Sequence, residues 1–140
     1  MCTPLLALLL AGSALAAPVP KELRKGDQSR FVGEWWECRM GDSTYTDPAT
    51  ARRFTFDADG NLGIRQNAGA TPTEYTAAVD RTAARPTFRL ASKGNVTSYN
   101  ARYRLDGDTL SFALTDPGLP LAETIAPGPG VIFYELKRLK

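Results

Sequence analysis

The chain has 140 residues, of which 43% are hydrophobic and 23% charged, with 17 Lys+Arg against 15 Asp+Glu and no histidine. This length and composition are typical of one globular domain. A net charge of +2 is too small to indicate a nucleic-acid-binding surface. The lack of histidine excludes Ser-His-Asp and Cys-His catalysis and His-ligated metal sites within this chain.

The first 17 residues are typical of a secretion signal. Leu5 to Leu10 is apolar throughout, and the small residues that follow end in Ala16-Ala17-Pro18, which resembles a signal cleavage site. An uncleaved membrane anchor is the alternative, but Pro4, Gly12 and the small residues interrupt the apolar run that a span requires. We therefore expect a secreted or periplasmic protein whose mature chain has no stable membrane insertion.

After the signal, we expect a lead-in segment at 18–30 and one domain at 31–140. Lys21 to Lys25 is predicted to form a helical turn, and the rest of the chain alternates between apolar and polar residues. Such alternation indicates strands with one buried face. The predicted strands are 31–40, 51–57, 61–67, 73–80, 86–92, 98–105, 109–115 and 130–139, and short strands at this spacing favour an antiparallel barrel or sandwich.

The alternation assigns faces to individual side chains. In the seventh predicted strand, Tyr99, Ala101, Tyr103 and Leu105 form the apolar face. In the eighth, Leu110, Phe112 and Leu114 are expected to be buried, and Thr109, Ser111 and Ala113 to face water.

Turn residues separate the strands. Asp106-Gly107 predicts a type I′ hairpin, which needs positive φ at both central residues. Asp57 to Asn61 resembles the start of a calcium loop, but the chain returns to strand at once, so we favour a plain hairpin there. The turn-rich segment 116–130 is too long for a tight hairpin, and is either a functional lid or a rigid cover over the barrel's end.

Gly33-Glu34-Trp35 resembles the G-x-W opening of the lipocalins, in which the Trp plugs one end of an eight-stranded barrel under a basic residue from the last strand. Arg138 lies in the last predicted strand and could supply that cation over Trp35. The resemblance implies an eight-stranded antiparallel lipocalin-like up-and-down barrel.

Nearly all of the mature chain is similar to a family of short, secreted lipocalin-like domains from planctomycete bacteria, which has no established activity. The resembling pieces, in chain order, are Gly33 with Trp35, Arg53-Phe54-Thr55-Phe56, Arg85 to Leu90, Tyr103 to Leu110, Pro127 to Gly130, and Leu136-Lys137-Arg138. This similarity implies export and a lipocalin-like fold, and it implies no reaction.

The first strand leaves its register open. Trp36, Cys38 and Met40 form an apolar face, which would put Trp35 and Glu37 on the opposite one. If Trp35 is the plug, Glu37 also points inward and needs a partner such as Arg, whereas a bulge near Trp35 would turn both tryptophans inward. Cys38 is expected to be a buried small hydrophobe rather than a nucleophile.

Six aromatic residues are candidates for a ligand site inside the barrel, where tyrosine hydroxyls would orient the ligand. They are Tyr75, Phe88, Tyr99, Tyr103, Phe112 and Tyr134. The favoured function is non-enzymatic binding of a small, mainly apolar ligand, with no cofactor, metal or nucleic acid. The alternatives are an interaction or structural module with a solidly packed barrel and, as the least favoured, an enzyme that uses carboxylates or tyrosines. An apolar void of about 300 Å³ or more with a mouth would favour ligand binding, whereas a filled interior would favour the interaction module.

Overall fold

The structure is a computed structural model that describes residues 28–80, 86–94 and 98–140. The predicted secretion signal, the predicted helical turn at Lys21 to Lys25 and most of the lead-in segment lie outside these residues. The described chain is almost all β, with one helical turn at residues 28–31. Its strands are β1 (Gly33–Met40), β2 (Ser43–Thr44), β3 (Arg53–Phe56), β4 (Asn61–Arg65), β5 (Thr73–Asp80), β6 (Thr87–Ser92), β7 (Ser98–Asp106), β8 (Thr109–Thr115) and β9 (Val131–Arg138).

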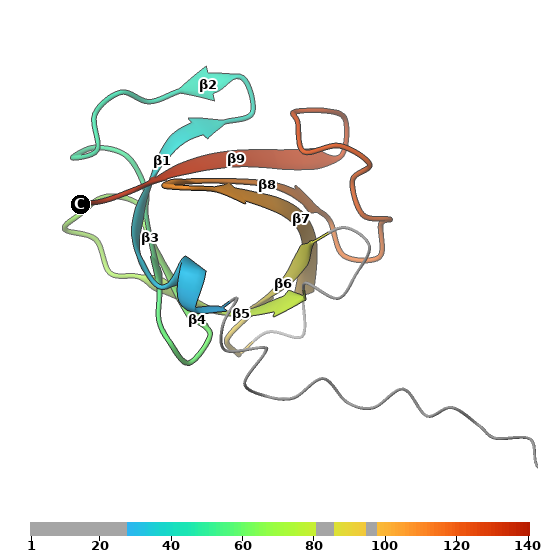
Figure 1. The fold of residues 1–140 in the computed structure, drawn as a ribbon, viewed down its shortest axis with the longest axis horizontal. Coiled ribbons are helices and arrows are strands. Elements are labelled where there is room, and N and C mark those ends of the chain that lie inside the picture. The colour runs from blue at the N-terminus through green and yellow to red at the C-terminus, as the bar shows by residue number, and fades with distance from the viewer. Residues whose placement is uncertain (1–27, 81–85, 95–97) are drawn as a thin grey trace, which may run out of the picture.

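The strands close into a barrel. From β3 to β9 each strand pairs antiparallel with the next one along the chain, β1 pairs with β3, and β9 pairs back with β1. Figure 1 looks into this ring of eight strands, with β2 paired to the end of β1 outside it. The predicted eight-stranded antiparallel up-and-down barrel is confirmed, and β2 is the strand that the alternation pattern missed.

The barrel encloses an aromatic cluster. Its rings make edge-to-face, tilted or stacked contacts, with centroids 4.9–6.4 Å apart. The members of this aromatic cluster are Phe31, Phe54, Phe56, Phe88, Tyr103, Phe112 and Tyr134. Such ring pairs each add about 0.5–1.5 kcal/mol beyond their area burial, so the cluster holds the strands around a common centre.

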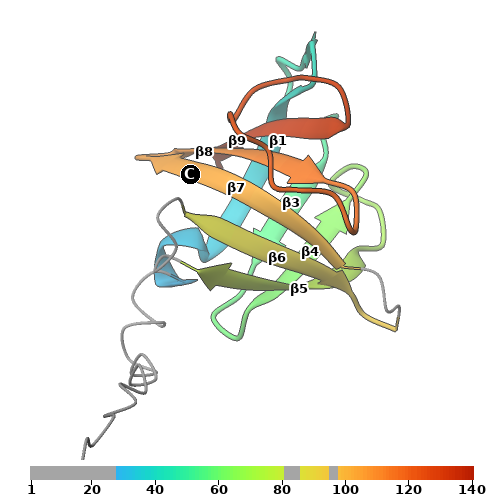
Figure 2. The same ribbon diagram turned by 90° about the vertical axis from the view of Figure 1, so that its right-hand side faces the viewer.

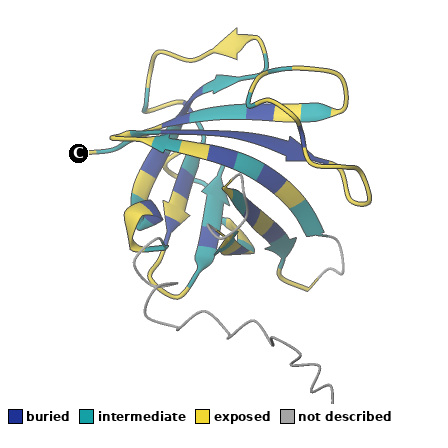
Figure 3. Cartoon of the chain, turned by 45° about the vertical axis from the view of Figure 1, so that its right-hand side comes forward, coloured by how far each residue is buried: buried dark blue, intermediate teal, exposed yellow. Residues whose placement is uncertain are grey.

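The expectation that one face of β8 meets water is wrong. Ser111, Ala113 and Thr115 are as buried as the residues that point into the barrel, and β8 is dark blue for most of its length in Figure 3. The register places Ala113 between Arg102 of β7 and Phe133 of β9. Hydrophobic alternation along one strand does not reveal burial that depends on the neighbouring strands.

The first strand keeps Trp35 and Glu37 facing inward, and its irregularity lies further on. The pairing of β1 with β9 shifts between Glu37 and Arg39, so Cys38 is the extra residue of a bulge. Beyond it, Met40 pairs with the inward-facing Tyr134. The alternative of a bulge near Trp35 that turns both tryptophans inward is therefore wrong. The bulge at Cys38 follows Trp35 and Trp36 in the chain, so it reverses the facing of later residues only and leaves the two tryptophans on opposite faces.

Two hairpins were predicted from their turn residues. β3 and β4 do form a plain hairpin, in which Asp57 Oδ1 accepts hydrogen bonds from the Asp59 and Asn61 amides at 2.9 and 2.8 Å. The β7–β8 hairpin is displaced by one residue, because Asp106 pairs with Thr109 and leaves Gly107 and Asp108 as the loop. Gly107 alone has positive φ, at 57°, which is the pattern of a type II′ turn rather than the predicted type I′.

Candidate functional site

One end of the barrel is closed by Trp35 and Arg138. Trp35 is fully buried, its indole nitrogen donates to the Phe31 carbonyl at 2.9 Å, and the Arg138 guanidinium lies 4.1 Å from its ring centroid. Arg138 also donates to the carbonyls of Val32 at 2.8 Å and Arg30 at 2.6 Å. The arginine thus joins the last strand to the helical turn at residues 28–31, and this turn sits across the barrel end.

Gly33 makes this arrangement sterically feasible. Its φ is +132°, a conformation that L side chains rarely adopt, and a Cβ atom there would lie 2.8 Å from Arg138 Nη1. The G-x-W spacing therefore has a local physical reason. The glycine leaves room for the guanidinium, and the residue two positions on presents its ring to it.

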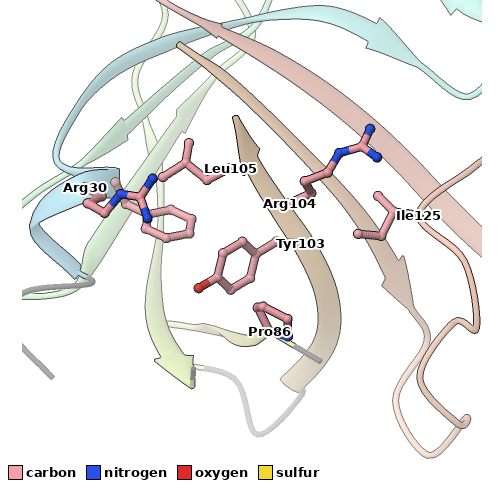
Figure 4. Close-up of a pocket in the computed structure, with 7 residues that line it drawn as sticks. Arg30, Pro86, Tyr103, Arg104, Leu105 and Ile125 are labelled. Carbon is pink, nitrogen blue, oxygen red and sulfur yellow. The ribbon is translucent and has the colours of Figure 1, made fainter. Parts of the chain in front are cut away.

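A pocket of about 330 Å³ opens beside this closed end. We call it the end pocket. Its described lining residues come from the helical turn, the residue before β6, the end of β7 and the long loop before β9 (Figure 4). They are Arg30, Phe31, Pro86, Tyr103, Arg104, Leu105 and Ile125.

The loop 116–130 forms one wall of the end pocket. The Arg102 guanidinium, on the outer face of β7, donates to the Ala122 carbonyl at 2.6 Å and to the Glu123 carbonyl. Ala122 is buried, and Ile125 lies three residues further along and reaches the pocket. The loop lies on the outside of the barrel (Figure 2), so it is a side wall rather than a lid over the interior.

A polar cluster lies inside the barrel around Glu37. Its carboxyl is 1% exposed, with Oε2 3.2 Å from Arg52 Nε and Oε1 without a hydrogen-bond partner among the described residues. Arg52 also contacts Met40 Sδ at 3.3 Å. Burial raises the pKa of Glu37 more than the Arg52 guanidinium lowers it, and burial likewise raises the pKa of Tyr134 nearby.

The structure separates the six predicted ligand residues. Phe88 and Phe112 are 2% and 1% exposed and belong to the aromatic cluster. Tyr75, Tyr99 and Tyr134 are half-buried against the core, and none of them lines the end pocket.

Tyr103 belongs to both the aromatic cluster and the end pocket, and is the one predicted ligand residue that lines the latter. Leu105 lines the end pocket but was not among the predicted ligand residues. Its position could have been predicted, because it continues the apolar alternation of Tyr103. No sequence pattern predicts that Arg30, Pro86 and Ile125 line the same pocket, because they come from segments that are distant in the chain.

Candidate catalytic chemistry is sparse in the part of the chain that the structure describes. There, no three histidine, cysteine, aspartate or glutamate side chains gather as metal ligands would. Cys38 is buried and donates to the Glu135 carbonyl at 3.2 Å, and desolvation raises its pKa to about 11. Such a thiol is protonated at neutral pH and is a poor nucleophile.

The same described residues include no helix long and apolar enough to cross a membrane. Comparisons with protein-family models, curated proteins and solved structures give no match to this chain.

Proposed function

We propose that this protein is an exported, non-enzymatic, lipocalin-like binding protein that takes a small, mainly apolar ligand in the end pocket. The observation that supports this function is the pocket itself. Its volume of about 330 Å³ lies within the range of small-molecule sites, roughly 300–1,000 Å³. Phe31, Pro86, Leu105 and Ile125 give it an apolar lining.

The end pocket replaces the barrel centre as the proposed ligand site. The tight ring contacts of Phe88 and Phe112 make the centre a packed core, and a ligand there would have to displace buried rings. At the end pocket, a ligand would instead contact apolar side chains that are already partly accessible, such as Leu105 and Ile125.

Two variants of the same loop test the proposal. Ile125→Trp would fill the end pocket, whereas Leu121→Trp adds the same side chain at a residue that is 41% exposed and does not line it. We expect a neutral N-phenylnaphthylamine dye to bind the protein with one site, measured by its fluorescence. Ile125→Trp should weaken this binding by about tenfold or more, and Leu121→Trp should leave it unchanged.

Either of two results would contradict the proposal: an absence of saturable dye binding, or equal binding by wild type and Ile125→Trp. The packed-barrel interaction module would then be the better account. Export is tested separately, by the mass of the protein recovered from its own host. That mass should correspond to cleavage after Ala16 or Ala17, and a retained first residue would contradict export with cleavage.

A further inference from the structure

The end pocket combines an apolar lining with two cationic side chains. Arg30 and Arg104 are the charged members of its described lining, and no acidic side chain is among them. Neither guanidinium forms an ion pair or hydrogen bond with another described residue, although the Arg30 carbonyl accepts from Arg138. Two arginines without counter-ions among the described residues, beside an apolar hollow, give this part of the pocket a positive charge.

The two arginines lie on different elements at opposite sides of the pocket. Figure 4 shows Arg30 on the helical turn and Arg104 on β7, with the Tyr103 ring between them, and the Arg104 guanidinium extends away from that ring. Arg138 holds the backbone carbonyl of Arg30 at 2.6 Å. The backbone from which the Arg30 side chain extends is therefore fixed to the barrel, while its exposed guanidinium has no partner among the described residues.

We propose that the end pocket selects small amphiphiles with a hydrocarbon body and one carboxylate, and that Arg30 is the main counter-ion with Arg104 as the second. This inference rests on the proposed function and names its ligand class. A guanidinium presents paired N–H donors that match the two oxygens of a carboxylate. The apolar lining takes the hydrocarbon body, as Phe31, Leu105 and Ile125 would for any small apolar ligand.

Octanoate and octanol test this selectivity, because they share a hydrocarbon chain and differ in charge at neutral pH. In dye-displacement titrations at low salt we expect octanoate to bind about tenfold more tightly than octanol, a difference of about 1.4 kcal/mol. Arg30→Gln should remove most of this preference and leave octanol unchanged, and Arg104→Gln should reduce it less. Arg89→Gln is the matched control, since Arg89 is an exposed arginine of β6 outside the pocket lining.

The outcomes separate this inference from the proposed function. If octanol binds as tightly as octanoate, or Arg30→Gln weakens both equally, the carboxylate selectivity is wrong while an apolar pocket stands. If neither compound displaces the dye and the dye itself does not bind, the selectivity and the proposed function are both wrong. A preference for octanoate that Arg89→Gln removes as strongly as Arg30→Gln would place its source in overall charge, and would overturn the role of Arg30.

Discussion

Replacing Arg138 tests the closure of the barrel end most sharply. Its side chain is 26% exposed, stacks on Trp35, and donates to two backbone carbonyls of the turn that precedes β1. A partly desolvated cation–π contact contributes about 0.5–2 kcal/mol, and a hydrogen bond from a charged donor about 1.5–3 kcal/mol. Arg138 Nε also lies 3.5 Å from Asp108 Oδ1, but the Asp108 side chain is half exposed, so this ion pair adds little to the stability.

These contributions are not additive, so we expect Arg138→Met to lower the free energy of unfolding by about 3 kcal/mol. With a urea dependence of roughly 1–3 kcal/mol/M for a small protein, the midpoint should fall by between about 1 and 3 M. Arg138→Lys keeps the charge but has a single nitrogen, which cannot reach both carbonyls and the ring, so its loss should be intermediate.

Urea unfolding followed by tryptophan fluorescence measures both variants, and Arg89→Met is the control. Arg89 is exposed on β6, so its replacement should change stability by about 0.5 kcal/mol or less. The reasoning would be refuted if Arg138→Met unfolded within about 0.5 kcal/mol of wild type, since the contacts to Trp35 and the helical turn would then contribute nothing measurable.

Three further predictions concern Gly33, Glu37 and Cys38. Gly33→Ala should lower the unfolding midpoint, because it strains a φ of +132° and crowds Arg138; a midpoint equal to wild type would contradict this. Burial raises the pKa of Glu37 above 4.5, so the stability of wild type relative to Glu37→Gln should rise as pH falls from neutral towards that value. A fall over the same range would mean that Arg52 dominates instead. The Cys38 thiol, with its pKa at about 11, should react slowly with an aromatic disulfide reagent at pH ~8 until the protein is unfolded, and fast reaction in the folded protein would be the opposite result.

The sequence was informative wherever a local pattern had a direct structural cause. Alternation in the run from Tyr99 to Leu105 located β7 and its inward face, because successive strand residues point to opposite sides. The spacing of Gly33 and Trp35 located the closed end, since the structure explains both residues by the approach of Arg138.

What the sequence could not provide depends on contacts between distant segments. Ser111 and Ala113 are buried on the outer face of β8, between residues of β7 and β9 that are distant in the chain. Arg102 attaches the loop 116–130 to the outside of β7, and Ile125 of this loop lines the end pocket with Arg30, which is almost a hundred residues away in the chain. No local sequence pattern predicts such a contact between distant segments.

Chemical-shift mapping of the protein during titration with the dye tests the location of the ligand site most directly. Titration of the isotope-labelled protein with the neutral naphthylamine dye should shift backbone amide signals of Phe31, Tyr103 and Ile125, which line the end pocket. The signals of Tyr75 and Tyr99, which lie outside that lining, should stay in place. Large shifts at Tyr75 and Tyr99 with none at Ile125 would contradict the account, because the ligand would then occupy a different part of the barrel.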